Sequence, residues 1–175
     1  VCLTTTLGDL CMELLETEAP VTDENFVGVV YRPATVCGYG PRQRLDLSVN
    51  ILTNFAVNKG KITVFGGDQL RPNLHIQDYA DLCKILLSEK DAKVANKIFN
   101  CGYGNGYSVM EIFKKFNSIS DSKIKFKIGK RRDSDIIISI ADPKELIKFT
   151  KWKPKFNNLS LIVKSSLNWY KKKIR

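Results

Sequence analysis

The sequence predicts an α/β fold, because strand-like segments alternate with helix-like segments along the chain. Phe26–Tyr31 (FVGVVY) is a continuous β-favouring run, typical of a buried strand in a parallel sheet. Leu45–Val57 has the apolar spacing of an amphipathic helix, and Asn58-Lys59-Gly60 then ends it. The composition is that of a globular protein, since 43% of the 175 residues are hydrophobic and 26% are charged.

The other elements are predicted from the same patterns: short apolar or alternating runs for strands, and 3.6-residue apolar spacing for helices. The further strands expected are Lys61–Phe65, Asn73–Ile76, Lys97–Asn100 and an alternating, half-buried Lys123–Ile128. The further helices expected are Leu7–Glu16, a helix N-capped by Asp78 and ending at Leu87, Ser108–Asn117, Pro143–Phe149 and Leu159–Lys172.

Several classes of protein are disfavoured by what the sequence lacks. No apolar run approaches the roughly 18–20 residues that cross a bilayer, and the first residues do not form a secretory signal. The odd number of cysteines and the absence of a CxxC pair argue against a disulfide framework or a metal site. We therefore expect a cytoplasmic protein with no membrane partner. Because the first residue is Val1 rather than Met, a piece of a longer protein and a stand-alone remnant both stay open as expectations.

The charge is distributed unevenly between the two halves. Residues 1–90 hold 8 basic and 11 acidic residues, whereas residues 91–175 hold 20 basic and 7 acidic residues. A half this basic is compatible with a polyanionic ligand or with an ordinary lysine-coated surface. A nucleic-acid-binding module is the less favoured alternative. The aromatics among these basic residues suit a hydrophobic core equally well, and no nucleic-acid motif is present.

The residues that carry chemistry are few. His75 is the only histidine, so no Ser/His/Asp set is predicted, and a structural role for His75 is favoured. The cluster Gly102, Gly104 and Gly106 stands between a strand and a helix, where a dinucleotide loop would lie. Its spacing is GxGxG rather than GxGxxG, which favours a tight turn with Ser108 capping the helix.

Two arginines follow strand ends and are the most informative side chains. Arg71 follows a glycine turn, and Arg132 follows the strand expected to end at Ile128. Guanidinium groups suit bidentate contacts with phosphate, so two of them from separate loops could clamp a diphosphate. From spacing alone, solvated surface arginines are the alternative.

Five segments, in this order, resemble the C-terminal half of the extended short-chain dehydrogenase/reductase family, the NAD-dependent sugar-nucleotide epimerases and dehydratases. They cover roughly residues 26–173, and their sequences are VVYRPATVCGYGPRQR, ITVFGGDQLRPNLHIQDYADL, IFNCGYGNGYSVMEI, RRDSDIIISIADPKELIKFTKWKPK and LIVKSSLNWYKK. Each landmark alone is a weak match, whereas the ordered set is fairly specific.

The resemblance implies a partial Rossmann-like fold: the C-terminal part of the parallel sheet plus a small α/β substrate-binding domain. Residues 1–40 would be a remnant of the Rossmann domain, and 41–175 the substrate-binding region, with about 73–105 returning to the sheet. By resemblance, Arg71 and Arg132 match the two arginines that contact the diphosphate of a sugar nucleotide. Phe65 and Gly66 match the strand end near the nucleoside base. Thr35 stands where the family's substrate-binding asparagine usually lies.

The family's catalytic machinery has no counterpart in the sequence. None of the six tyrosines is followed four residues later by lysine, so the family's Tyr-x-x-x-Lys pair is absent. Counting back from Leu7–Glu16 places Cys2 and Thr6 near those positions, and neither can supply a phenolate base or an ammonium group. No catalytic residue is therefore predicted.

The family's cofactor, NAD or NADP, is implied by the resemblance, but the glycine-rich loop that binds it is also missing, and the chain alone is expected to be inactive. A non-catalytic nucleotide- or protein-binding remnant is the alternative function. A homodimer is expected only with the missing N-terminal half, because many members of the family dimerise through that half. With neighbouring strands missing, Phe26–Tyr31 is expected to present an open sheet edge that favours self-association.

Overall fold

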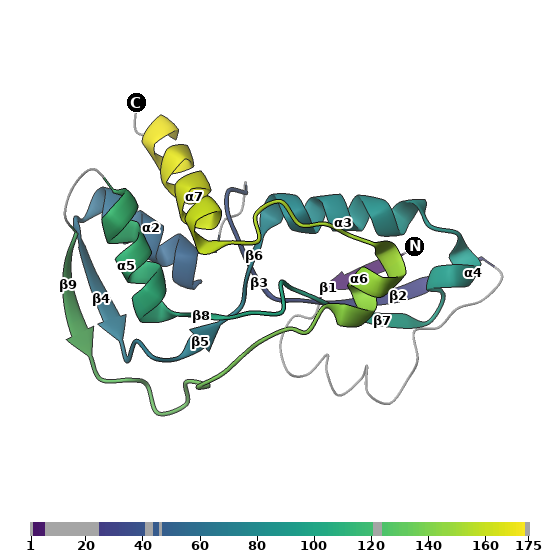
Figure 1. Cartoon of the computed structure of the whole chain (residues 1–175), viewed down its shortest axis with the longest axis horizontal. Helices are drawn as coiled ribbons and strands as arrows, with labels where there is room; N and C mark the ends of the chain where they lie inside the picture. The colour runs from purple at the N-terminus through teal and green to yellow at the C-terminus, as the bar shows by residue number, and fades with distance from the viewer. Residues whose placement is uncertain (1, 6–24, 41–43, 46, 121–123, 174–175) are drawn as a thin grey trace.

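The structure is a computed structural model, and it describes residues 2–5, 25–40, 44–45, 47–120 and 124–173. Figure 1 shows an elongated molecule in which two groups of helices and strands lie at opposite ends of the long axis. Short paired strands run between them. No helix in the described part of the chain is long and apolar enough to cross a bilayer.

The first lobe is built on a parallel sheet in the order β1-β2-β7. The strands are β1 (Cys2–Thr5), β2 (Gly28–Pro33) and β7 (Lys97–Cys101). Its helices are α3 (Ile76–Ser88), α4 (Asp91–Val94) and α6 (Lys144–Thr150). Apolar side chains of β2, α3, β7 and α6 share one core with Trp152. Residues near 150 therefore belong to this lobe, together with the segment of α3 and β7.

The second lobe consists of α2 (Ser48–Asn58), α5 (Val109–Ile119) and α7 (Leu159–Lys173) packed on two parallel strands. These strands are β4 (Lys61–Phe65) and β9 (Lys125–Gly129). All three helices and β4 contribute buried residues to a second core. Alternation explains β4, whose Ile62 and Val64 are buried while Lys61, Thr63 and Phe65 are exposed.

Two short strand pairs join the lobes. The strand β3 (Thr35–Cys37) runs parallel to β6 (Asn73–His75), and β5 (Leu70–Arg71) runs antiparallel to β8 (Tyr107–Ser108). Because β5 and β6 are consecutive, the chain that leaves the second lobe at β5 enters the first lobe at α3. The segment around Arg71 therefore lies where the two lobes meet.

Most predicted elements are present, with small differences in their bounds. The buried parallel strand expected at Phe26–Tyr31 is confirmed as β2, and Lys61–Phe65 is confirmed as β4. The Ser108 cap is confirmed by a capping box, in which the Ser108 hydroxyl accepts from the Glu111 N–H and the Glu111 carboxylate accepts from the Ser108 N–H. The helix expected at Leu7–Glu16 lies outside the described residues.

Three expectations about individual elements are wrong. The N-cap of α3 is His75, and the Asp78 carboxylate lies in the first turn with other partners. The strand β9 is exposed rather than half-buried, because the buried core residues of the β4–β9 pair come from β4. Phe126 contacts Phe113 yet stays 51% exposed, and Ile128 is 59% exposed. The strand β2 has no open edge, since β1 and β7 pair with it on both sides.

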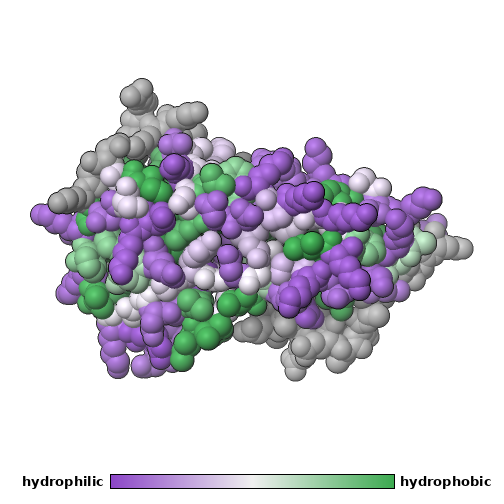
Figure 2. Space-filling view, viewed as in Figure 1, coloured by the Kyte–Doolittle hydropathy of each residue, from purple (hydrophilic) through white to green (hydrophobic). Residues whose placement is uncertain are grey.

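Exposed apolar surface gathers instead on the segment between β9 and α6. Its isoleucines are 46–65% exposed, and they are Ile136, Ile137, Ile138 and Ile140. Figure 2 shows hydrophobic surface at the lower margin of the molecule, over this segment. The segment is held to β5, because the Leu70 N–H donates to the Ile137 carbonyl and the Ser139 N–H donates to the Leu70 carbonyl.

The buried carboxylate of Asp78 ties three distant parts of the chain together. It accepts hydrogen bonds from the Tyr103 hydroxyl at 2.6 Å and from the backbone N–H groups of Lys155 and Phe156 at 2.8 Å. The Tyr103 hydroxyl in turn accepts from the His75 N–H at 3.0 Å. These bonds fix α3, the turn after β7 and the segment before α7 to one another.

We expect Asp78→Ala to lower the free energy of unfolding by about 3 kcal/mol or more, because it removes the shared acceptor of three partly buried donors. The matched control is Asp81→Ala, one turn further along α3, which removes an ion pair with Lys155. That change should cost less than about 1 kcal/mol. Urea unfolding of the three proteins measures both values, and equal losses for the two variants would contradict this role of Asp78.

Candidate functional site

Four of the five predicted substrate-binding residues line one pocket of about 290 Å³. They come from four separate segments: Thr35 from β3, Phe65 from the end of β4, Arg71 from β5, and Arg132 from the segment after β9. The fifth residue, Gly66, follows Phe65 directly in the turn beyond β4. The fold thus brings together side chains that are far apart in the sequence.

The Arg71 guanidinium is held in a fixed position at this pocket. Its Nη1 donates to the Leu70 carbonyl at 2.8 Å and to the Ile136 carbonyl at 2.7 Å, while Nη2 forms an ion pair with Asp135. The Arg71 side chain is 19% exposed. A partly buried guanidinium with this many acceptors has little rotamer freedom left, so a ligand that binds it meets a preorganised group.

The Gln69 side chain braces this ion pair from the glycine turn. Its Nε2 donates to Asp135 Oδ2 at 2.9 Å and to the Phe65 carbonyl at 2.6 Å, and its Oε1 accepts from the Gly67 N–H at 2.6 Å. Gln69 is only 3% exposed, and its amide makes three hydrogen bonds. The end of β4, the glycine turn and Asp135 are therefore one hydrogen-bonded unit.

Gly66 allows this turn to close. Its φ of +71° lies in the left-handed region, and a Cβ there would stand 2.8 Å from Gln69 Oε1 and 3.2 Å from Arg131 Cβ. A side chain at position 66 would therefore push against the amide that holds Asp135. Gly66 therefore serves to close the turn, while its neighbour Phe65 lines the pocket.

The two neighbouring arginines Arg131 and Arg132 face different partners. The Arg132 guanidinium lies 5.4 Å from the centroid of the Phe65 ring, a cation–π contact at the pocket. Arg131 lies 3.9 Å from the Asp68 carboxylate and does not line the pocket. Arg132 is thus the cation of this pair that a pocket ligand could reach.

The opposite wall of the pocket is apolar and comes mainly from α2. Leu47, Ile51, Leu52 and Phe55 line it, with Val109 of α5. Two guanidinium groups and one carboxylate give the pocket a net positive charge beside an apolar wall and the Phe65 ring. This combination suits a ligand with a phosphate-like anionic part and a flat, weakly polar part.

The glycine cluster after β7 does not fit the pyrophosphate of a dinucleotide. A Cβ on Gly102 would stand 2.9 Å from Ala141 Cβ, and one on Gly106 would stand 3.2 Å from Ile140 Cγ1. The protein's own chain therefore packs against these glycines, where a cofactor loop would leave space for phosphate. This confirms the interpretation of the cluster as a tight turn, and no NAD contact is assigned to it.

The structural role predicted for His75 is confirmed. Its Nδ1 accepts from the Gln77 N–H at 3.1 Å, so the proton resides on Nε2, which lies 2.9 Å from Ser165 Oγ. The His75 Nε2–H therefore donates to the Ser165 hydroxyl. A general base would instead direct a nitrogen lone pair at that hydroxyl. The ring also stacks on Phe156, with centroids 3.8 Å apart. This Ser–His pair is not a nucleophile and its base.

Cys37, Cys83 and Cys101 are poor nucleophiles as well. Burial raises the pKa of Cys37 and of Cys101 to about 12, and burial also raises the pKa of Cys83. Thiols at neutral pH then stay protonated, and the thiolate is the reactive form. Cys2, which the count from the resemblance placed near the catalytic tyrosine, lies in strand β1 rather than at the start of a helix. Thr6 lies outside the described residues.

Among the pocket residues that sequence reasoning missed, Gln69 and Asp135 are the two that hold the Arg71 guanidinium in place. Asp135 carries a signal in the sequence, since it ends the Arg-x-x-Asp motif that Arg132 begins. Gln69 carries none, because its partner Asp135 is 66 residues away. Among the described residues, no three His, Cys, Asp or Glu side chains come together as a metal site would require.

Comparisons with known proteins agree on one family. The model of the NAD dependent epimerase/dehydratase family matches residues 12–102. The UDP-glucose 4-epimerase of Neisseria gonorrhoeae is 31% identical over 116 residues, which are 62% of this chain and 34% of that protein. The UDP-glucose 4-epimerase of Dictyostelium discoideum is 30% identical over 137 residues, which are 71% of this chain and 39% of that protein.

Known structures with the same fold include epimerases. A UDP-glucose 4-epimerase from Stenotrophomonas maltophila, with bound NAD and formylated UDP-arabinopyranose, matches with a TM-score of 0.78 and 23% identity, over 95% of this chain and 54% of that one. One from Thermotoga maritima, with UDP-glucose, matches with a TM-score of 0.72 and 25% identity, over 95% and 51%. The chain thus spans about half the length of these structures. The likeness confirms the predicted partial Rossmann-like fold.

The burial of His75 makes a prediction about pH. Burial lowers its pKa, and the nearby Asp78 opposes this only in part. In the unfolded chain the His75 imidazole becomes protonated below about pH 6.5, whereas in the folded chain it stays neutral to a lower pH. The folded state therefore loses stability as the pH falls below about 6.5. The loss is at most about 1.4 kcal/mol per pH unit. His75→Asn should flatten the unfolding free energy between pH 7 and 5, and equal slopes would contradict the prediction.

Proposed function

Because the chain belongs to the NAD-dependent epimerase/dehydratase family, we propose that it binds a nucleoside-diphosphate sugar in the pocket of Thr35, Phe65, Arg71 and Arg132. The observation that carries this proposal is the meeting of Arg71 and Arg132 in one pocket, although they lie on different segments. In this proposal the chain is the sugar-nucleotide-binding half of an epimerase or dehydratase.

The two guanidinium groups take the diphosphate. Arg71 offers a preorganised cation, fixed by the Leu70 and Ile136 carbonyls and by Asp135. Arg132 is more exposed and lies on the Phe65 ring, so it can turn toward an incoming phosphate. Charge-assisted hydrogen bonds from guanidinium to phosphate are among the strongest polar contacts in proteins, which supports these roles.

The remaining pocket residues hold the nucleoside and the sugar. The Phe65 ring and the apolar wall of α2 offer a flat, dry surface for the nucleoside base, beside Gly66 in the turn. Thr35 adds a hydroxyl from β3, in place of the asparagine amide usual in the family. Proteins related to this chain support the ligand class, since two of the matched structures contain UDP-glucose or a UDP-arabinopyranose derivative.

The carboxylate of Asp135 sets a limit on what the pocket accepts. It neutralises part of the charge of Arg71 and would repel an anion that approached it directly. A diphosphate is then expected to bind between Arg71 and Arg132, on the side away from Asp135. A single phosphate gains less, because it cannot reach both guanidinium groups as readily.

Chemistry on the sugar requires groups that we infer to come from outside this chain. No tyrosine in the sequence is followed four residues later by lysine, and the described glycine cluster is packed against the protein itself. NAD, which the family uses for hydride transfer, would then be held by residues other than these.

We expect Arg132→Met to weaken UDP binding about 10- to 100-fold, since a charged hydrogen bond contributes roughly 1.5–3 kcal/mol. The matched control is Arg131→Met, which removes the same charge from the adjacent residue outside the pocket. UDP binding to the control should stay within about twofold. Titration calorimetry measures all three affinities. Equal losses for the two variants would show a general charge effect and contradict the proposed site.

We also expect negligible NAD-dependent conversion of UDP-glucose or UDP-galactose by this chain alone. The physical reason is that the sequence has no Tyr-x-x-x-Lys pair, whose phenol would take the proton that leaves with the hydride. Product analysis after prolonged incubation with NAD and either sugar nucleotide tests this. Detectable epimerisation would show that the chain carries its own catalytic groups.

A further inference from the structure

A second pocket lies beside the proposed sugar-nucleotide site and is lined by lysines. It has a volume of about 400 Å³. Its lysines are Lys59 at the end of α2, Lys61 on β4, and Lys125 and Lys127 on β9. Phe55, Phe126, Ile62 and Thr63 complete it, so no acidic side chain of the described residues lines this pocket.

The register of β4 and β9 places positive charges side by side. Lys61 is the direct partner of Lys125, and Thr63 is the partner of Lys127. Like charges at directly opposed positions destabilise a strand pair. None of the four lysines forms an ion pair with a described side chain; the Lys59 ammonium lies over the Phe55 ring instead, 4.7 Å from its centroid. A bound anion would relieve this repulsion.

Lysines on an exposed strand also prevent sheets from pairing edge to edge, which is the ordinary explanation for Lys125 and Lys127. That explanation does not require Lys59, which comes from the end of a helix, to join the strand lysines around one cavity. It also does not require the cavity to carry aromatic rings. Convergence from three elements on one concave surface is the feature that points to a ligand.

The two pockets are neighbours, because Phe55 and Thr63 line both of them. We propose that the lysine pocket binds a phosphate-rich anion at a site separate from the sugar-nucleotide diphosphate. This site does not depend on the proposed function, since its lysines are not those of the arginine pocket.

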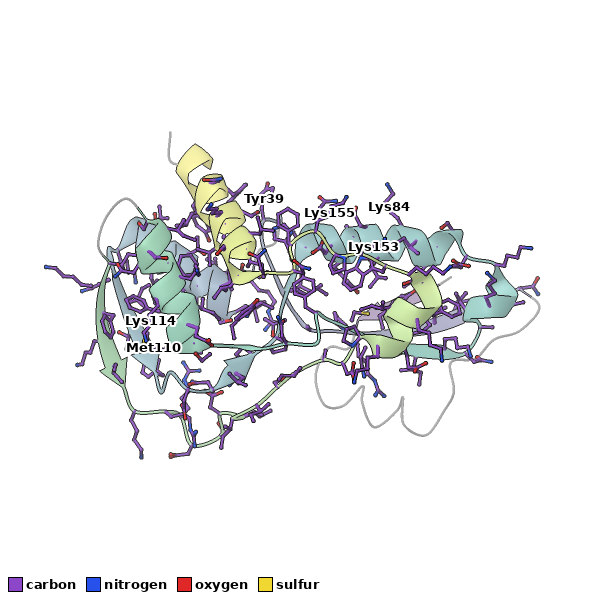
Figure 3. The ribbon with its side chains drawn as sticks, in the orientation of Figure 1. Tyr39, Lys84, Met110, Lys114, Lys153 and Lys155 are labelled. Atoms are coloured by element: carbon purple, nitrogen blue, oxygen red, sulfur yellow. The ribbon has the colours of Figure 1, made fainter. Side chains whose placement is uncertain are left out.

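The test uses inorganic triphosphate as the probe and Arg132→Met as the background, so that the arginine pocket competes less. Titration calorimetry is run on this protein, on a site variant with Lys61→Gln and Lys127→Gln, and on a charge-matched control with Lys84→Gln and Lys153→Gln. The control lysines are exposed and lie on α3 and after α6, as Figure 3 shows, away from the pocket.

We expect saturable binding that weakens about tenfold in the site variant, a loss of about 1.4 kcal/mol, and by less than about twofold in the control. No saturable binding, or equal weakening in both double variants, would overturn the proposal. In the chain with Arg132 intact, UDP affinity should stay within about twofold when Lys61 and Lys127 are changed to Gln. Triphosphate binding thus tests the lysine site and UDP binding tests the sugar-nucleotide site, so a failure of one can be distinguished from a failure of the other.

The source of the phosphates is resolved by a second probe, a twelve-nucleotide oligothymidylate. If it binds more tightly than triphosphate and loses affinity in the same site variant, the anion is a nucleic-acid strand whose bases reach Phe55 or Phe126. If triphosphate binds as tightly, the anion is a small polyphosphate. Both results support the lysine site, and oligothymidylate binding that the control variant weakens equally counts against it.

Discussion

The arrangement of the two lobes depends on one buried carboxylate, that of Asp78. Three donors from the turn after β7 and the segment before α7 converge on it, and α3 carries it. Because α3 follows β6 without a break, the same contact fixes β6 and β3 beside it. Burying a carboxylate is unfavourable unless its hydrogen bonds are made, so the three segments must come together for the fold to be stable.

The pocket follows from this arrangement. Arg71 stands two residues before β6, and the segment after β9 pairs with β5 through Leu70. That pairing sets Ile136 and Asp135 against the Arg71 guanidinium, and it places Arg132 near the end of β4. The position of the proposed diphosphate clamp thus depends on backbone pairing between segments, and side-chain contacts then fix the Arg71 guanidinium. Gln69 and Gly66 complete it by closing the turn between β4 and β5.

The sequence predicts those features whose causes are local. Alternation over Lys61–Phe65 and the Ser108 capping box depend only on neighbours in the chain, and both are present. Features that depend on distant partners are predicted poorly. Alternation in β9 suggests a buried face, but Phe126 and Ile128 stay more than half exposed, because the buried core residues of the pair come from β4. The residue type and position of Asp78 suggest an N-cap, but the groups that its carboxylate binds lie about 25 and 77 residues away in the chain.

The candidate site shows the same division. The resemblance to a family identifies Arg71 and Arg132, because motifs preserve their spacing, and the structure brings both to one pocket. It does not reveal that Asp135 already forms an ion pair with Arg71, or that lysines from the end of α2, from β4 and from β9 line a neighbouring pocket. These facts arise from strand register and from segments packing side by side, which a single sequence does not specify.

The most direct test of the central claim is a crystal structure of this chain grown with UDP. We predict that the diphosphate lies within about 3 Å of both the Arg71 and the Arg132 guanidinium groups, with uracil against the Phe65 ring. UDP bound elsewhere on the chain, or held by only one of the two arginines, would contradict the proposed site.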